Sequence, residues 1–537
     1  MENQIFSLLW LSKERRSYHL DEKTIEDLNI SEMIQLDSSK GQALFHYLKE
    51  VPINIEDINY RQGILEEFAD NRPLLAAIKS FVNKCHNIYR RVCFTKDKEP
   101  TLYNLLYLID SVSQVMDLIE DIHATLMNMK VKSMGLIHYK EELEKGVYHH
   151  LYKSFKSDVR NMKALTSDIA SLKIGINLDD NLRPEAAMLL SFHEKSLKLT
   201  RTIRRANYRF NYDPNAITSM PKELILPHTA SKNNPLSNIE KLLEPAVYQL
   251  ITFCDQFIEG LLAMHAGLNE EFEFYDLGIE MYDVLKQNGY YLCQPLMFEQ
   301  GKTIIDSAYN INLAYKMIGD KNSTVSDMIY NSFTANQDGN IYILTGANRG
   351  GKTTFTQAIG QIFWLAQLGL FVPAKKAALR ILDGIFMHFP SHEESTCHHG
   401  RFGNDCKCFS EIYKKLTPNS LLLMNESFSA TSHLESLTVA FEAVKALKEV
   451  GVTTIFNTHL HELGRMIIDL NYVGENKTKC VSLVTGTEEV HQSFAVYEGE
   501  PLGQSYAQDI AISYGLTFEQ LIRDDRLRKV VLAATKG

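Results

Sequence analysis

A glycine-rich loop between a predicted strand and a predicted helix constrains the fold of this chain more than any other feature. The β-favouring run "NIYILT" at residues 340–345 leads directly into "GANRGGKTT", which fits the pattern G-x-x-x-x-G-K-[ST]. Glycines let the backbone fold around phosphate groups, so that its N–H groups point inward at the positive end of the following helix. A chance match is possible in 537 residues, but the strand-to-helix context favours a P-loop that binds a nucleotide.

The residues of this loop have separate expected roles. We expect Lys352 to reach the outer phosphates of ATP and Thr353 to offer its hydroxyl to Mg²⁺. ATP and Mg²⁺ are therefore the predicted cofactors. The predicted ATP-binding residues are Gly346, Ala347, Asn348, Arg349, Gly350, Gly351, Lys352, Thr353 and Thr354.

Two further predicted strands bring polar groups to the same place. The hydrophobic run in "SLLLMNESFSATS" ends at Asn425 and Glu426, and the run in "VTTIFNTHL" ends near His459. Helical segments such as "LESLTVAFEAVKALKEV" alternate with these strands, which predicts a parallel sheet with the ligand at its carboxyl edge. We predict Glu426 and His459 as catalytic residues: Glu426 would orient and deprotonate the attacking water, and His459 would sense the γ-phosphate. A single histidine after a strand is usually structural, so the prediction depends on all three elements meeting.

Asn425 stands where a nucleotide hydrolase keeps a metal-binding carboxylate. Together with Thr353 it is the predicted metal-binding residue. An amide can hydrogen-bond a metal-bound water, but it lacks the charge that strengthens such a bond. We therefore expect ATP binding to survive, hydrolysis to proceed through Glu426, and both turnover and Mg²⁺ dependence to be weaker than with aspartate.

The chain before about residue 320 has the apolar spacing of long amphipathic helices. Segments such as "NIEDINYRQGILEEF" and "TLYNLLYLIDSVSQVMDLIEDIHATLMNM" place apolar residues every three or four positions. The predicted fold is therefore multidomain, with an all-α region over 1–320 followed by an α/β P-loop domain over 321–537. A helical packing scaffold would explain the first region without any further function.

Basic residues near position 200 are candidates for contact with nucleic acid. They alternate with Tyr208, Phe210 and Tyr212, and aromatic rings can lie against bases while cations neutralise phosphates. A solvated helix face is the simpler interpretation of such a run. Because the net charge is −10, any nucleic-acid surface must be local. The candidate DNA-binding residues are Lys198, Arg201, Arg204, Arg205 and Arg209.

The N-terminal residues and the lengths of the apolar runs predict a cytoplasmic chain. No basic lead precedes the first apolar run, and no segment has about 18 uninterrupted apolar residues. The run "AIGQIFWLAQLGLFVPA" is interrupted by Gln361 and Gln367, which favours a buried helix. The eight cysteines do not suggest a disulfide framework. One cluster has poor spacing for zinc and is interpreted as a polar loop: Cys397, His398, His399, Cys406 and Cys408.

The motifs together resemble the MutS family of DNA mismatch-repair proteins, whose ATPase domain is of the ABC type. The resemblance rests on "TGANRGGKTTFTQAIGQIFWLAQLGLFVPA", "SLLLMNESFSATS" and "TIFNTHLHEL", and it extends to "INIEDINYRQGILEEF" and "LKQNGYYLCQPLM" in the helical region. It covers nearly the whole chain. It implies a helical core and lever over 1–320, with a possible small clamp-like segment at about 165–235, and an ATPase domain over 321–537.

The resemblance also implies partners. It predicts double-stranded DNA, possibly mismatched or branched, as the ligand of a clamp that ATP binding and hydrolysis open and close. It predicts a homodimer formed through a helix-turn-helix at about 503–530, where Thr517 and Gln520 would form a capping box. No membrane partner is expected.

Three departures from the family pattern bear on function. Asn425 replaces an aspartate. Gly400, Arg401 and Phe402 align with the family's signature segment, but the serine that contacts ATP in the partner subunit does not. The first helices resemble those of the family's core, so we expect the chain to lack the domain that inserts an aromatic residue beside a mispaired base. Two alternatives stay open: a nucleotide-gated interaction module, and an ATPase that acts on branched DNA or structured RNA without recognising mismatches.

Overall fold

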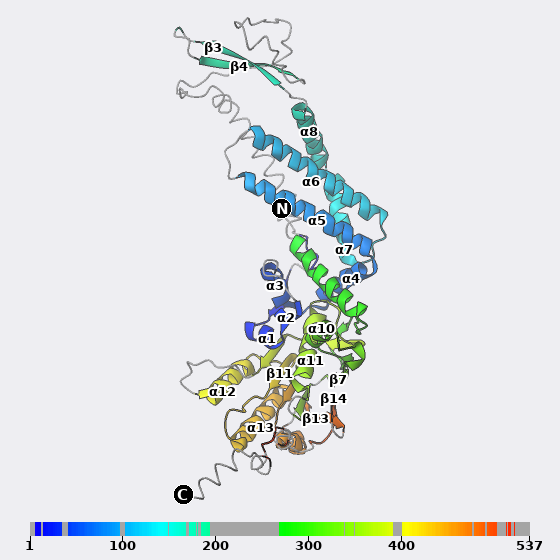
Figure 1. Cartoon of the computed structure of the whole chain (residues 1–537), viewed down its shortest axis with the longest axis vertical. Helices are drawn as coiled ribbons and strands as arrows, with labels where there is room; N and C mark the ends of the chain where they lie inside the picture. Colours follow the sequence, from blue (N-terminus) through cyan, green and yellow to red (C-terminus); the bar gives the residue numbers. More distant parts are fainter. Residues whose placement is uncertain are drawn as a thin grey trace. The chain divides into compact units, whose positions relative to one another are not determined.

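The chain forms two compact units of helices and mixed sheets (Figure 1). One unit contains Met1–Leu8 and Glu67–Phe272, and the other contains Leu9–Glu66 and Glu273–Gly537. The predicted domain boundary near residue 320 stays a prediction. The computed structural model describes residues 6–516 and Gln520, except for 12–13, 35–40, 97–101, 149, 168–170, 179, 181–183, 194–267, 338, 348–349, 390–399, 475–476, 489–490, 502–511 and 513.

The first unit, as far as it is described, consists of long helices and a β-hairpin. The predicted apolar spacing is confirmed in the second long helix of this unit, where Ile109, Val112 and Met116 are buried. The carboxylate of Glu67 accepts hydrogen bonds from the backbone N–H groups of Lys132 and Ser133, both at 2.7 Å, just before a helix begins. The elements are α5 (Arg72–Lys96), α6 (Leu102–Asn128), α7 (Met134–Tyr148), α8 (His150–Ser167), and the antiparallel strands β3 (Ser171–Leu178) and β4 (Pro184–His193).

The second unit is built on a six-stranded sheet in the order β10-β11-β12-β8-β13-β14. Neighbouring strands are parallel except for the β13–β14 hairpin, as the alternation of strands and helices predicts. The carboxyl ends of the parallel strands therefore meet at one edge. The strands are β8 (Asn340–Thr345), β10 (Gly384–His388), β11 (Ser420–Asn425), β12 (Thr453–Asn457), β13 (Lys479–Glu488) and β14 (His491–Glu498).

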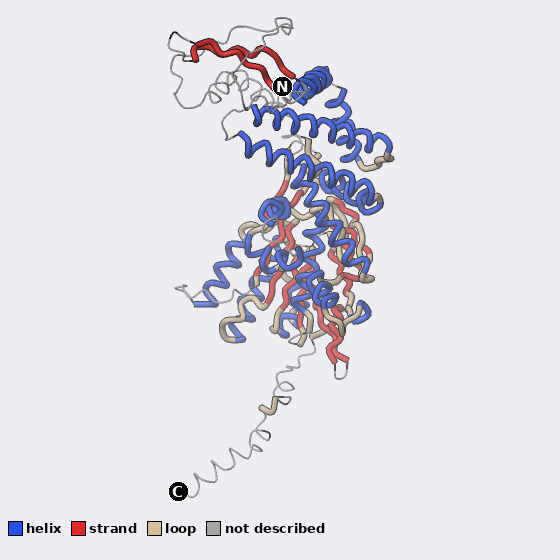
Figure 2. The backbone as a smooth tube through the Cα atoms, turned by 45° about the horizontal axis from the view of Figure 1, so that its top comes forward, coloured by secondary structure: helices blue, strands red, loops and turns tan. Residues whose placement is uncertain are grey.

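Helices cover both faces of this sheet (Figure 2). Alternate residues of a strand point to opposite faces. Leu423 packs toward Gly360 of α11 (Lys352–Gln367), whereas Leu422 and Met424 belong to the core cluster on the other face. That second face is covered by α12 (Gly400–Tyr413), α13 (His433–Val450), α14 (His461–Arg465) and α15 (Ile467–Tyr472).

A four-stranded sheet and the N-terminal elements complete the second unit. Its strand order is β5-β9-β6-β7, with β5 (Leu296–Phe298), β6 (Thr303–Ala308), β7 (Asn331–Ala335) and β9 (Lys376–Arg380). The 3₁₀ turn η1 spans Val325–Asp327. The remaining elements are β1 (Ser17–His19), α1 (Glu22–Asp27), α2 (Ile30–Ile34), α3 (Gly41–Lys49), β2 (Glu50–Pro52), α4 (Ile55–Asp70) and α10 (Ile311–Gly319).

Side-chain amides anchor α11 inside this unit. The side chain of Gln361 donates to the carbonyl of Leu28, and that of Gln367 donates to the carbonyls of Pro52 and Leu382. Both glutamines are fully buried. The residues that interrupt the apolar run thus bond distant backbone segments, and the predicted buried helix is confirmed. Among the described helices of the chain, none has the length and apolarity that a membrane span requires.

Candidate nucleotide-binding site

The loop after β8 has a backbone that requires glycine. Gly346 has φ 143° and Gly351 has φ 80°, both in the region that L side chains rarely adopt. A Cβ atom on Gly346 would also lie 2.0 Å from the Oγ1 atom of Thr485. Gly351 is the N-cap of α11, so the loop ends at the positive end of a buried helix. Asn348 and Arg349 lie outside the described residues.

Lys352 is the first residue of α11, and its side chain turns back onto the loop. Its Nζ atom donates to the carbonyl oxygens of Gly346, at 3.0 Å, and Ala347, at 2.9 Å. The side chain is 5% exposed. Burial lowers the pKa of Lys352, and the nearby Glu426 carboxylate opposes this effect. The loop therefore keeps a buried cation whose only bonds described here are to neutral carbonyls.

A cavity of about 440 Å³ lies beside the loop. We call the lining from the start of α11 and from Glu426 the polar end. The apolar end is the set of apolar side chains that segments before β8, together with β14, add to the same lining. Its apolar residues are Tyr309, Leu313, Met317, Met328, Ile329 and Phe494. Sequence motifs do not indicate this end, because its residues are single apolar positions scattered over nearly two hundred residues.

At the polar end, Thr353 meets two amides rather than a carboxylate. Its Oγ1 atom lies 3.0 Å from Oδ1 of Asn425 and 3.3 Å from Nδ2 of Asn457. Asn457 also donates to Asn425 Oδ1, and the parallel register of β11 and β12 pairs the two asparagines directly. Our sequence prediction does not include Asn457. The available signal was a polar residue at the end of a buried strand, in "TIFN", which matches Asn425 in "LLLMN".

The structure brings Glu426 and His459 together at this edge. Nε2 of His459 lies 2.8 Å from Oε1 of Glu426, and the backbone N–H of Glu426 donates to the carbonyl of Asn457 at 2.8 Å. The hydrogen bond from His459 lowers the pKa of Glu426 and outweighs the opposite effect of burial. Glu426 is thus ionised at neutral pH and lines the cavity, which is the state that a general base requires.

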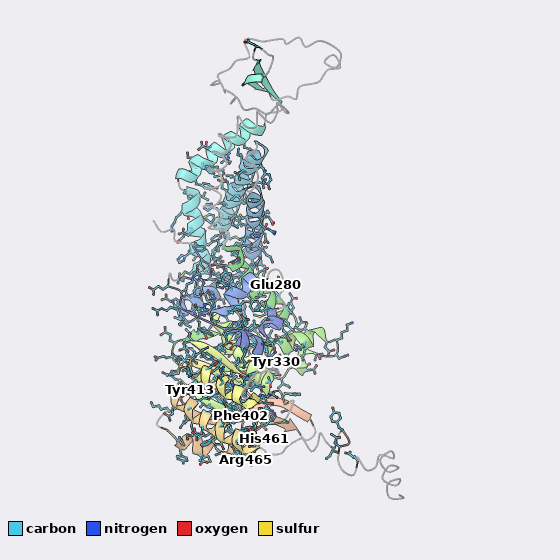
Figure 3. The ribbon with its side chains drawn as sticks, turned by 90° about the vertical axis from the view of Figure 1, so that its left-hand side faces the viewer. Glu280, Tyr330, Phe402, Tyr413, His461 and Arg465 are labelled. Carbon is cyan, nitrogen blue, oxygen red and sulfur yellow. The ribbon has the colours of Figure 1, made fainter. Side chains whose placement is uncertain are left out.

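Other predicted site residues do not line the cavity or lie outside the described residues. Gly400, Arg401 and Phe402 form the first turn of α12, whose residues Phe402 and Tyr413 are labelled in Figure 3. Cys406 and Cys408 lie on the same helix, and no group of three metal-binding side chains occurs among the residues that the structure describes. Several candidates lie outside the described residues: Cys397, His398, His399, Lys198, Arg201, Arg204, Arg205, Arg209 and Thr517, together with most of 503–530.

Comparisons with known families agree with this architecture. The family model of MutS domain V matches residues 342–523, which include the loop, Glu426 and His459. The family model of the MutS2 N-terminal domain matches residues 53–288. Over these two regions the chain resembles the MutS family. The resemblance stated from its motifs is therefore confirmed.

Individual relatives in the MutS family share little sequence identity with this chain. The DNA mismatch repair protein MutS of Petrotoga mobilis is 24% identical over 96% of this chain and 65% of its own length. MutS of Clostridium tetani is 22% identical over 94% of this chain and 60% of its own, and MutS of Rickettsia akari is 24% identical over 79% and 50%. The chain thus spans between half and two thirds of these MutS proteins.

Proposed function

We propose that this MutS-like chain is an ATPase whose site lies at the carboxyl edge of the six-stranded sheet. The observation that carries the proposal is the meeting of Lys352, Thr353 and Glu426 in the lining of one cavity, with His459 bonded to Glu426. These residues follow three separate strands. A buried cation, a hydroxyl and an ionised carboxylate are the groups that nucleotide hydrolysis needs at this spacing.

Lys352 and the loop would bind the phosphates. In this role, Nζ of Lys352 exchanges its two loop carbonyls for oxygens of the β- and γ-phosphates. That exchange favours binding, because a buried ammonium gains far more from an anion than from a neutral carbonyl. The residues assigned to the loop are Gly346, Ala347, Asn348, Arg349, Gly350, Gly351 and Thr354.

The oxygens of Thr353 and Asn425 fit a hard divalent cation. Their Oγ1 and Oδ1 atoms are 3.0 Å apart, and Mg²⁺ prefers oxygen ligands, directly or through water. When bound, Mg²⁺ would offset charge on the phosphates. Glu426 accepts a proton from the attacking water. As the oxygen of that water bonds to the γ-phosphorus, the bond from the γ-phosphorus to ADP breaks and ADP leaves. His459 holds the carboxylate in place through the 2.8 Å hydrogen bond.

The apolar end of the cavity would take the base of the nucleotide. Phe494 presents an aromatic ring that is 44% exposed, and Leu313 and Ile329 are 39% and 41% exposed. Exposed apolar side chains around a cavity lose water when a flat ring covers them. This surface would therefore supply affinity without direct involvement in the chemistry.

We further propose that ATP binding and hydrolysis control a DNA clamp formed by a homodimer. The relatives are DNA mismatch repair proteins, and the basic residues Arg201, Arg204 and Arg205 are candidates for contacts with the DNA backbone. Coupling of this kind must act in both directions, so DNA must change nucleotide affinity by the same factor that nucleotide changes DNA affinity.

The test is ATP turnover by the full chain with and without matched, mismatched and branched duplexes. The proposal expects turnover that one of these DNAs changes, and salt-dependent DNA binding that is lost when Arg201, Arg204 and Arg205 are changed to glutamate. Preference for a branched duplex would favour processing of DNA structures over mismatch repair. Turnover that no DNA alters, without salt-dependent binding, would reject the DNA clamp.

A second candidate is a nucleotide-gated interaction module with little turnover. The observation that favours it is the pair of amides, Asn425 and Asn457, around the hydroxyl of Thr353. Neither amide provides the negative charge that a carboxylate would give to a bound cation. Tight ATP binding with no turnover in the presence of every DNA tested would select this candidate.

A further inference from the structure

The turn that carries Glu426 has a backbone that L-amino acids seldom adopt. Glu426 has φ 49° and Phe428 has φ 65°, so two non-glycine residues within three positions are left-handed. Such conformations cost conformational free energy and persist only where surrounding contacts hold them. The contacts that hold this turn therefore also fix the position of the Glu426 carboxylate.

Helix α12 makes two of the contacts that hold Phe428, and Ser436 of α13 adds a third by donating to the carbonyl of Phe428 at 2.7 Å. The Oδ2 atom of Asp405 accepts a hydrogen bond from the backbone N–H of Phe428 at 3.0 Å. The ring of Phe409 packs edge-on against the ring of Phe428, with centroids 5.2 Å apart. Asp405 and Phe409 are four residues apart, so they lie on one face of α12. The buried side of this helix thus holds both the backbone and the ring of Phe428.

His388, at the end of β10, links the same turn to α12 a second time. Its Nε2 atom lies 3.1 Å from the carbonyl oxygen of Asp405, and its Nδ1 atom lies 2.6 Å from Oγ of Ser427. Burial lowers the pKa of His388, so the ring is neutral. A carbonyl only accepts, so Nε2–H donates to Asp405 and Nδ1 accepts from the Ser427 hydroxyl. Both hydrogen-bonded links between the turn and α12 therefore end at Asp405, one at its carboxylate and the other at its backbone carbonyl.

The side chains of α12 are less buried than those of α11, although Phe402, Phe409 and Tyr413 pack against the core cluster. None of its residues, all of which the structure describes, is fully buried, whereas most residues of α11 are. Its outer face carries Lys407 and Glu411, both exposed. One short helix thus contacts the turn with one face and solvent with the other. A displacement of α12 would therefore reach the turn that carries Glu426.

We propose that Asp405 is a positioning residue for hydrolysis and that docking of α12 sets the position of Glu426. With α12 in place, the turn stays left-handed and Glu426 points into the cavity. Displacement of α12 releases the turn and withdraws the carboxylate from the attacking water, while Lys352 and the loop still hold the nucleotide. This inference rests on the proposed ATPase function and adds the element that controls it.

The experiment compares two variants of Asp405 in the full chain, with kcat for ATP and the Kd for ATP measured separately. Asp405→Ala removes the acceptor, and we expect kcat to fall about 10- to 100-fold, because small misplacement of a catalytic group has effects of this order. The Kd should stay within about twofold, since Asp405 does not line the cavity. Asp405→Asn keeps an acceptor oxygen and should retain most of the turnover. Glu411→Ala, on the outer face of α12, is the control and should behave as wild type.

Three outcomes would overturn the inference. They are wild-type kcat in Asp405→Ala, an equal loss in Asp405→Asn, and a loss of kcat matched by weaker ATP binding. If Asp405→Ala does not fold, Ser427→Ala removes only the hydroxyl bonded to His388, and unchanged kcat there would also overturn it. A wild-type chain that binds ATP without turnover would reject the proposed hydrolysis and this role with it. Turnover in wild type that Asp405 and Ser427 do not affect would reject the inference alone.

Discussion

The two ends of the cavity differ in how much they depend on a ligand. At the polar end, called the phosphate end below after the groups we propose it binds, Lys352 is 5% exposed and Asn457 is fully buried. Both residues have hydrogen-bond partners within the protein. At the apolar end, called the base end below, Phe494 is 44% exposed and Ile329 is 41% exposed. The first end is arranged before any nucleotide arrives, whereas the second gains burial only when a base covers it. Chemistry and affinity are thus assigned to different surfaces of one cavity.

The largest effect is expected at the phosphate end, from Lys352→Ala. The variant removes a buried cation of the loop, and a charged hydrogen bond to phosphate inside a protein has no substitute among the neighbouring carbonyls. We expect ATP binding to be lost, with an affinity reduced at least about 100-fold, as measured by titration calorimetry. The control is Lys445→Ala, which changes a partly exposed lysine of α13 that pairs with Glu442. Near-normal affinity in Lys352→Ala would contradict the assignment of the loop.

A smaller loss of affinity is expected at the base end, from Phe494→Ala. Stacking of a base on an aromatic ring contributes about 1–3 kcal/mol, so the Kd for ATP should rise roughly 5- to 150-fold. The kcat at saturating ATP should change little, because an apolar ring takes no part in proton transfer. Tyr497→Ala is a matched control, since Tyr497 is an aromatic residue on the same strand that does not line the cavity. Equal effects of the two variants would contradict the proposal that this surface binds the base.

Asn425→Asp tests the charge at the phosphate end. Aspartate restores a negative oxygen beside Thr353, and ionised acceptors make stronger bonds than neutral ones. We expect the Mg²⁺ concentration needed for half-maximal turnover to fall several-fold, and kcat to rise. An unchanged Mg²⁺ requirement would show that the amide does not limit the site.

The smallest effect is a shift in pH dependence on removal of His459. Glu426 acts as a base only when ionised, and the hydrogen bond from His459 lowers its pKa. Turnover in the wild type should therefore persist as the pH falls until it reaches this lowered pKa. In His459→Ala the pKa of Glu426 rises, so the acid limb of the kcat profile should move to higher pH. His433→Ala, which changes an exposed histidine paired with Glu462, should leave the limb in place.

The sequence predicts that Lys352, Thr353 and Glu426 converge because these residues follow local rules, and their role in phosphate chemistry stays a prediction. A glycine loop, a lysine and a strand that ends in polar residues occur in short contiguous stretches, and the parallel sheet then brings these stretches together. Asn457 was missed because its role depends on the register that pairs it with Asn425. The family relationship was also predictable from these stretches, and the family models confirm it.

The features that the sequence does not predict depend on contacts between residues far apart in the chain. The base end joins Tyr309 and Met328 to Phe494, which are apolar positions without a motif. The partner of Gln361 is the carbonyl of Leu28, more than three hundred residues away, so the amide seemed only to interrupt an apolar run. The left-handed turn at Phe428 would be expected at glycine, and long-range contacts with α12 and α13 hold a phenylalanine there.

The central claim is that Glu426 activates water at a site prepared in advance by the loop. The most direct test is ATP binding and turnover in Glu426→Gln, which keeps the shape of the side chain and removes its negative charge. The account predicts an affinity for ATP within about threefold of wild type and a kcat reduced at least about 100-fold, because removal of the base affects only the transition state. Turnover at the wild-type rate in this variant would contradict the account.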